Sequence, residues 1–242
     1  MEAGGTMPNS GHLHWDYRDG RVAAVAAAIV YSLWTLEVVL PGSGVVQGSP
    51  TETAFVGFLD SAHRTAAVLV LLTAGLGLAL GAREARPWLT VSWWSMAVFG
   101  AASLVAALLP GRCAVAIDAA CASESLAEGV AGASGAQTVS AVVAILAALL
   151  GVCALAVNRY LAGDRAWPFV AVLAVLQAVA TVAVLVLAVR VYAAGGDGSP
   201  GIALGPLERA HLVTVALWLL AAGVLPGPWK RSRAARTAGL SR

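Results

Sequence analysis

The feature that most constrains this chain is a long apolar run that follows the polar residues 60–64 and ends at Arg83. No charged residue interrupts it between Arg64 and Arg83. About 20 apolar residues in an α-helix cross the hydrocarbon core of a bilayer, so this run predicts a membrane-spanning helix over residues 60–82. Its polar head must face water, other helices or a ligand, because an unpaired charge in hydrocarbon is costly.

Comparable runs recur along the chain. Hydrophobic residues make up 59% of the sequence and charged residues only 12%, against about 25% charged in soluble domains. We therefore predict an all-α integral membrane bundle of six transmembrane helices in residues 21–226, between a tail at 1–20 and a basic tail at 227–242. The expected spans cover residues 22–40, 60–82, 88–109, 138–157, 167–192 and 208–225.

The first run has an alternative interpretation as a cleaved signal peptide, since Arg18 and Arg21 precede it. Its apolar core exceeds the usual 7–15 residues, and no small-x-small cleavage site follows Leu40, which favours a retained span. In the second run, Gly77-Leu-Ala-Leu-Gly81 places small residues together and predicts close packing of a neighbouring helix.

The basic residues predict an orientation. With six spans, eleven of the fifteen Lys and Arg residues lie on the side of the termini, and eight of the thirteen acids lie on the other. The positive-inside rule then places both termini in the cytoplasm of a bacterial cell. Trp88, Trp167 and Trp229 fall at the cytoplasmic ends of spans, as an aromatic belt requires.

This arrangement brings a set of polar residues to similar depth at the extracytoplasmic rim. We call it the rim cluster, and it consists of Glu37, Asp60, His63, Arg64, Glu208, Arg209 and His211. One interpretation is that the acids cap helix N-termini and pair with the arginines while the histidines lie at headgroup level. A second is a lipid-headgroup pocket.

A third interpretation of the rim cluster is a metal site. Two helices repeat an acid-x-x-His spacing, in Asp60 with His63 and in Glu208 with His211. This spacing occurs in carboxylate metal sites of helical bundles, and these ligands suit Zn or Fe. A metal there could activate water against a lipid headgroup.

The cysteines divide by context. Cys113 and Cys121 lie in the loop after the third span, which is extracytoplasmic in this orientation, so a disulfide between them is permitted. A metal pair is the alternative, although the spacing is not CxxC and the loop has no His. Cys153 lies inside an apolar run and is interpreted as a small buried hydrophobe.

The same loop carries a family resemblance. Its pattern Leu109-Pro110-x-x-Cys113-x-x-x-x-Asp118-x-x-Cys121 resembles that of bacterial six-helix membrane proteins grouped as the domain of unknown function 998 family, which is related to Frag1-like membrane proteins. The resemblance covers residues 20–226 and implies six helices and a bacterial membrane, but no established reaction. Many members of that family carry a His where this chain has the segment 135–138, so a role of that His does not transfer.

The remaining chemistry is sparse. The sequence has no GxSxG, HExxH, P-loop or dinucleotide fingerprint, and the centres of the spans offer no acid or base. A coupled carrier usually needs such a group at mid-membrane, so transport is the least favoured function. Gln177 is interpreted as a helix-to-helix hydrogen-bonding residue.

We therefore predict a non-enzymatic envelope or lipid-handling component. The alternatives are a metal- or His-assisted enzyme on lipid headgroups and a small-molecule carrier. Membrane lipids are the expected partners, and the basic tail from Lys230 to Arg242 suits anionic lipid. A net charge of only +2 gives no reason to expect nucleic acid, and a homo-oligomer or an envelope partner stays open.

Overall fold

A computed structural model describes residues 17–33, 50–81, 86–109, 134–193 and 204–225, and the secondary-structure elements within these ranges are all helices. The described helices, in chain order, are α1 (Tyr17–Ser32), α2 (Pro50–Leu76) with its π-helical end η2 (Gly77–Gly81), α3 (Pro87–Leu108), α5 (Ser134–Leu161), α6 (Trp167–Ala193) and α7 (Leu204–Val224).

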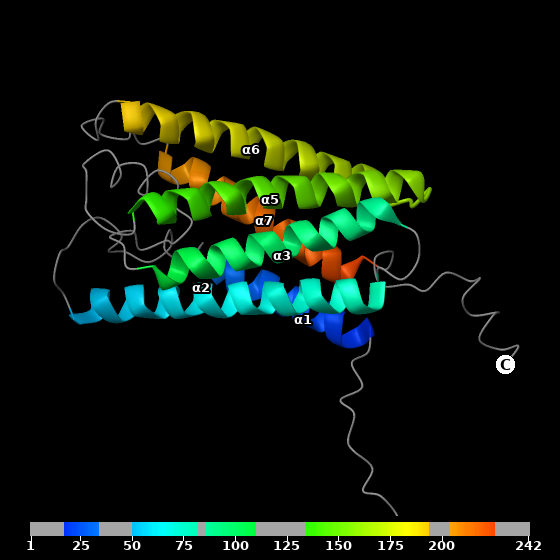
Figure 1. The fold of residues 1–242 in the computed structure, drawn as a ribbon, viewed down its shortest axis with the longest axis horizontal. Helices are drawn as coiled ribbons and strands as arrows, with labels where there is room; N and C mark the ends of the chain where they lie inside the picture. Colours follow the sequence, from blue (N-terminus) through cyan, green and yellow to red (C-terminus); the bar gives the residue numbers. More distant parts are fainter. Residues whose placement is uncertain (1–16, 34–49, 82–85, 110–133, 194–203, 226–242) are drawn as a thin grey trace, which may run out of the picture.

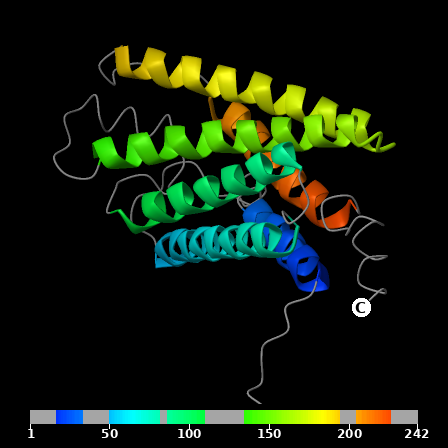
Figure 2. The same cartoon turned by 45° about the vertical axis from the view of Figure 1, so that its right-hand side comes forward.

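The helices pack as a closed ring. Each helix packs on two neighbours, in the order α1, α2, α3, α5, α6, α7 and back to α1. Figures 1 and 2 show the helices running along the long axis of the molecule, with α7 crossing behind α5. The first turn of α1 and the end of α7 lie at the same end, which we call the terminal end (Figure 1).

Aromatic side chains fill the interior of the ring. Phe99 of α3 meets Tyr31 of α1 edge-on with ring centroids 5.8 Å apart, and meets Trp218 of α7 edge-on at 6.0 Å. All three are at most 2% exposed. Edge-to-face pairs at such distances are favourable beyond the area they bury, so these rings tie α1, α3 and α7 together across the interior.

Two glycines leave room for tryptophan side chains of a neighbouring helix. A methyl group on Gly151 of α5 would overlap the Trp218 indole, and one on Gly77 would overlap the Trp93 indole. Close packing at the Gly77 segment is therefore confirmed. It takes the form of a π-helical turn against α3.

The outer surface is apolar. Among the described residues, four helical segments are long and apolar enough to cross a membrane, at Ser61–Leu80, Pro87–Leu108, Gly135–Leu161 and Trp167–Arg190, and a shorter apolar stretch covers Ala210–Val224. On α6 an exposed stripe runs along the whole helix through Val172, Val175, Val179, Val182, Val186 and Val189. Such a surface is stable in lipid and not in water, which indicates an integral membrane protein.

Several predicted boundaries are confirmed and others are wrong. The spans expected at 88–109 and 167–192 match α3 and α6 to within one residue. The expected loop at residues 41–56 is wrong from Pro50 onward, because α2 begins there, ten residues before the predicted start at Asp60. The helix α7 likewise begins at Leu204, four residues before Glu208, and α5 extends four residues beyond each end of the span expected at 138–157.

Candidate functional site

The rim cluster does not assemble as the sequence predicted. Asp60 is the eleventh residue of α2, so capping of that helix by Asp60 is wrong. Glu208 is the fifth residue of α7, whose first turn holds no acid. Glu37 lies outside the described residues, as do Cys113 and Cys121, and for Asp60, Glu208 and Arg209 the structure describes the backbone alone.

The two histidines of the rim cluster lie in different places. His63 and His211 are both buried, at 1% and 3% exposure. They belong to α2 and α7, which are separated in the ring by α1. The side chains that the structure describes contain no group of three or more His, Cys, Asp or Glu residues able to hold a metal ion. The Zn or Fe site of His63, His211, Asp60 and Glu208 stays a prediction.

His63 is the centre of the first polar site, which we call the outer site. Its ring lies 6.2 Å from the ring of Tyr31 and faces the backbone of Ser103 on α3. The Tyr31 and Ser103 hydroxyls are fully buried and have no hydrogen-bond partner among the described residues. The outer site thus combines the His63 imidazole of α2 with the Tyr31 hydroxyl of α1 and the Ser103 hydroxyl of α3, neither of which has a described hydrogen-bond partner. The ring of Phe99 lies next to Tyr31.

The depth of the outer site follows from its positions in the helices. Tyr31 lies fourteen residues after the start of α1 and Ser103 sixteen after the start of α3, both counted from the terminal end. At about 1.5 Å per residue these are distances of roughly 21 and 24 Å. In a hydrocarbon layer about 30 Å thick, the outer site lies toward the side away from the termini.

His211 is the centre of the second polar site, which we call the middle site. The amide nitrogen of Gln177 on α6 lies 2.9 Å from His211 Nε2 and 3.5 Å from the Thr181 hydroxyl oxygen. The Thr214 hydroxyl contacts the Gln177 Oε1 atom and also lies 2.7 Å from the backbone oxygen of His211. The Gln177 amide therefore donates to Nε2, which places the ring proton of a neutral His211 on Nδ1.

The middle site confirms one prediction made from the sequence. Gln177 lies ten residues into α6, about 15 Å from its start, which is half the thickness of a hydrocarbon layer. The expectation that the histidines lie at headgroup level stays a prediction, since the apolar stretch of α7 begins at Ala210, next to His211. The interpretation of Gln177 as a helix-to-helix hydrogen-bonding residue is confirmed.

Tyr31 and Thr214 were missed by the sequence reasoning. Each is a lone polar group inside an apolar run, and such a residue faces either the interior or the lipid depending on the helix rotation. Only the packing of α1 against α2 and α7 distinguishes these cases.

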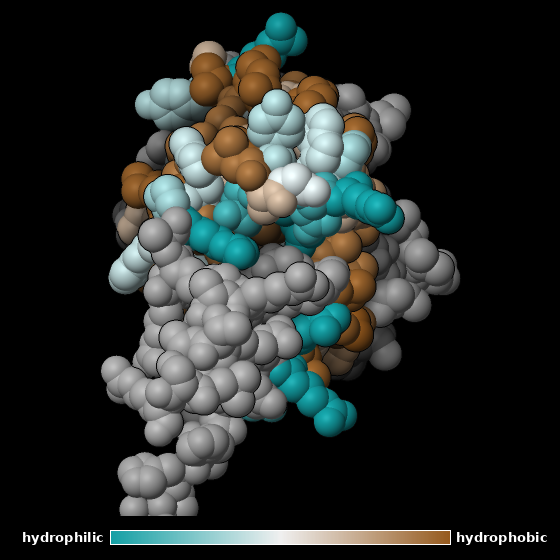
Figure 3. All heavy atoms as spheres, turned by 90° about the vertical axis from the view of Figure 1, so that its right-hand side faces the viewer, coloured by the Kyte–Doolittle hydropathy of each residue, from teal (hydrophilic) through white to brown (hydrophobic). Residues whose placement is uncertain are grey.

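The terminal end carries the charge. Figure 3, which looks onto this end, shows hydrophilic side chains gathered between apolar ones. The described basic residues here are Arg18, Arg21, Arg86, Arg159 and Arg165, with Asp19 and Asp164 as the described acids. Arg21 bonds α1 to its neighbour α7, since its Nε and Nη2 each donate at 2.9 Å to the last carbonyls of α7, those of Gly223 and Val224.

Comparison with known proteins adds no match: no family model, no curated protein and no solved structure is similar to this chain. The resemblance to the six-helix family stays a prediction from the loop pattern. The function of this chain is therefore inferred from the two polar sites and from the charges at the terminal end.

Proposed function

We propose that the protein is a six-span component of the bacterial cytoplasmic membrane that binds lipid at its extracytoplasmic side without catalysing a reaction. The observation that carries this proposal is the outer site. Two buried hydroxyls, those of Tyr31 and Ser103, have no partner among the described residues and flank the imidazole of His63.

The chemistry of the outer site favours a ligand with polar oxygens and an apolar body. A buried hydroxyl without a hydrogen bond costs about 1–3 kcal/mol, so a ligand oxygen that accepts from it binds favourably. The surroundings of the hydroxyls are aromatic and apolar, and the outer surface of the bundle is in contact with acyl chains in a membrane. A lipid headgroup ester or phosphate supplies the oxygens, and its chains supply the apolar body.

The charge distribution supports the orientation. Five of the seven described arginine side chains lie at the terminal end. Arg190 lies near the opposite end of α6, and Arg64 lies midway along α2, near the start of its apolar segment. Positive residues stay on the cytoplasmic side, so the termini are proposed to lie in the cytoplasm and the outer site to face outward. Two reporter fusions after Arg242, one active only in the cytoplasm and one only outside, test this orientation.

Lipid that co-purifies with the protein tests the binding proposal. Mass spectrometry of the purified full-length chain and of Tyr31→Phe compares the amount of bound lipid per protein. Loss of one hydrogen bond of about 1 kcal/mol lowers affinity roughly fivefold. Tyr160→Phe is the matched control, because Tyr160 is exposed on α5. Equal lipid in wild type and Tyr31→Phe, or an equal loss in both variants, contradicts the proposal.

A carrier is the second candidate, and the middle site favours it. An ionisable group at mid-membrane is typical of proton-coupled transport, and His211 bonds to Gln177, which lies about 15 Å along α6. Against it, the rings of Phe99 and Trp218 fill the interior beside α7. Reconstituted vesicles with a pH gradient discriminate the two: a carrier dissipates the gradient with wild type and much more slowly with His211→Gln, whereas a lipid-binding component leaves it unchanged in both.

A further inference from the structure

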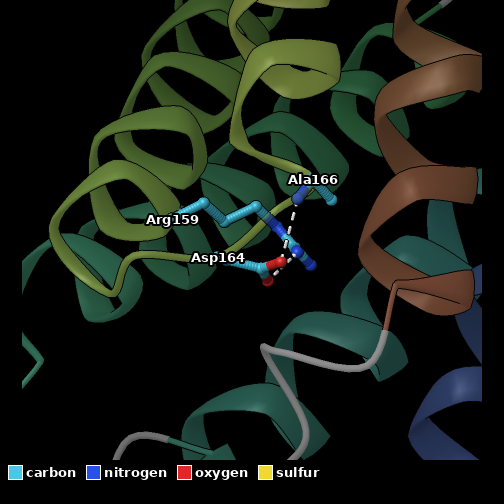
Figure 4. Close-up of polar contacts among 3 residues, drawn as sticks. All are labelled: Arg159, Asp164 and Ala166. Atoms are coloured by element: carbon cyan, nitrogen blue, oxygen red, sulfur yellow. Dashed lines mark hydrogen bonds and ion pairs between the residues drawn. The ribbon is translucent and has the colours of Figure 1, made fainter.

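A buried ion pair lies at the turn between α5 and α6. Arg159, in the last turn of α5, is 1% exposed, and its Nη1 lies 2.5 Å from Oδ2 of Asp164. The other carboxylate oxygen of Asp164 accepts from the backbone N–H of Ala166 at 3.0 Å. Figure 4 shows the Arg159 side chain reaching across the turn to Asp164. Both carboxylate oxygens of Asp164 thus accept a bond, whereas only the Nη1 atom of the Arg159 guanidinium donates one.

The rest of the guanidinium has nothing to bind in the described part of the chain. Arg159 Nε and Nη2 are both buried and both lack a hydrogen-bond partner there. A buried charged donor without an acceptor is costly, and Asp164 satisfies only the opposite side of the group. The Nε and Nη2 atoms form one edge of the guanidinium, and this edge matches two oxygens of a carboxylate or phosphate.

The neighbouring residues place this edge at headgroup depth. The apolar span of α5 ends at Leu161, two residues after Arg159. Tyr160 and Trp167 are exposed, and their rings meet edge-on with centroids 5.3 Å apart. Exposed Tyr and Trp at the end of a span mark the interface between hydrocarbon and headgroups. Asp164 is partly exposed, at 29%, and lies against the Nη1 side of the guanidinium.

We propose that the Nε and Nη2 edge of Arg159 binds two oxygens of a phosphate group. The phosphate belongs either to an anionic phospholipid of the adjacent leaflet or to inorganic phosphate, since both present the same pair of oxygens. Asp164 holds the guanidinium in place and, through its negative charge, weakens the binding of the anion. This site is separate from the outer site, at the opposite end of the bundle.

Binding to the purified full-length protein tests this site. The probes are short-chain phosphatidylglycerol, short-chain diacylglycerol as the lipid without phosphate, and inorganic phosphate, each followed by calorimetry and by the midpoint of thermal unfolding. We expect wild type to bind phosphatidylglycerol and not diacylglycerol. If inorganic phosphate binds as tightly as the lipid, the site is assigned to free phosphate. If only phosphatidylglycerol binds, the site is assigned to the lipid headgroup.

Three variants decide whether Arg159 is responsible. Arg159→Gln removes the charge and is expected to weaken binding about tenfold or more, because hydrogen bonds to charged groups are the strong ones. Arg165→Gln is the matched control: Arg165 is exposed in the same turn, and binding is expected to change less than twofold. Asp164→Asn keeps the oxygen that accepts from Ala166 but removes the competing charge, so it is expected to bind several-fold more tightly.

The outcomes are separable from misfolding. Unchanged binding in Arg159→Gln, or an equal loss in Arg165→Gln, overturns the proposal. If Arg159→Gln does not fold, Arg159→Lys decides: it keeps the positive charge but lacks the paired Nε and Nη2 donors, so the site requires weaker binding in that variant, and an unchanged affinity rejects the proposal. No binding of phosphatidylglycerol or phosphate to wild type rejects it as well.

Discussion

The side-chain amide of Gln177 on α6 lies 2.9 Å from Nε2 of His211 on α7, and both residues are buried. The same amide contacts Thr214 through its oxygen, so Gln177 joins two residues of α7 one turn apart. Inside a membrane bundle no water is present to bond to either side chain, so Gln177 and His211 depend on each other for hydrogen bonding. This pair is the main polar link between α6 and α7 in the described residues.

The first prediction concerns the coupling of this pair. We expect Gln177→Leu and His211→Phe to be non-additive, with a coupling energy of about 0.6–1.7 kcal/mol, the range of such bonds in membrane proteins. A double-mutant cycle on unfolding in mixed micelles measures it. The control cycle pairs Gln177→Leu with Thr65→Val, because Thr65 is exposed on α2 and bonds to the Ser61 carbonyl of its own helix. Additive changes in both cycles would contradict the link.

The sequence predicted the apolar helices better than the mixed ones. The ends of α3 and α6 were predicted to within one residue, because Pro87, Trp167 and Pro168 mark where apolar runs begin. The start of α2 was predicted ten residues late. Residues 50–59 mix polar and apolar side chains, and a hydropathy pattern does not reveal a helical segment of that kind. The pattern Ser49-Pro50-x-Glu52 was the available signal, because it is typical of a helix start.

The sites were less predictable than the helices. Gln177 could be identified from the sequence because an amide in an apolar run needs a partner. Its partner His211 could not, because the pairing depends on how far α7 is shifted along α6. Tyr31 and Ser103 depend in the same way on the rotation of α1 and α3.

The second prediction concerns Gly151. A methyl group there would overlap the Trp218 indole, and the Gly151 carbonyl accepts from the Ser92 hydroxyl at 2.9 Å. Gly151→Ala is therefore expected to lower the free energy of unfolding by about 1–3 kcal/mol through overpacking. Gly75→Ala is the matched control, since a methyl group on Gly75 meets nothing within 4 Å. Thermal unfolding in detergent compares them, and an equally stable Gly151→Ala would show that the indole can move aside.

The third prediction concerns the Tyr31 aromatic packing. Tyr31→Ala leaves a cavity next to Phe99 and His63 and is expected to cost about 3–5 kcal/mol, as large-to-small changes of aromatic residues do. Tyr31→Phe keeps the ring and is expected to cost less than about 1 kcal/mol, because its hydroxyl has no partner in the described chain. Unfolding of the two variants in the same detergent measures the difference. Both variants are compared after removal of co-purified lipid, and a costly Tyr31→Phe would then mean that the hydroxyl bonds to another part of the chain.

The fourth prediction concerns the contact between the two ends of the described chain. Arg21 donates to the carbonyls of Gly223 and Val224, the last residues of α7, where acceptors lack partners within the helix and a positive charge is favoured by the helix dipole. Gly223 makes this possible, because a methyl group there would lie 2.9 Å from the Ala24 Cβ atom and hold α1 away. Arg21→Gln is expected to lower the free energy of unfolding by about 1 kcal/mol, a modest value because Arg21 is exposed.

Arg18→Gln, which removes an exposed charge one turn earlier in the same helix, is the control and is expected to change the free energy of unfolding by less than about 0.5 kcal/mol. Hydrogen exchange of the last turn of α7 provides a second measurement: it should rise in Arg21→Gln alone, and equal exchange in both variants would mean that α1 does not fix the end of α7.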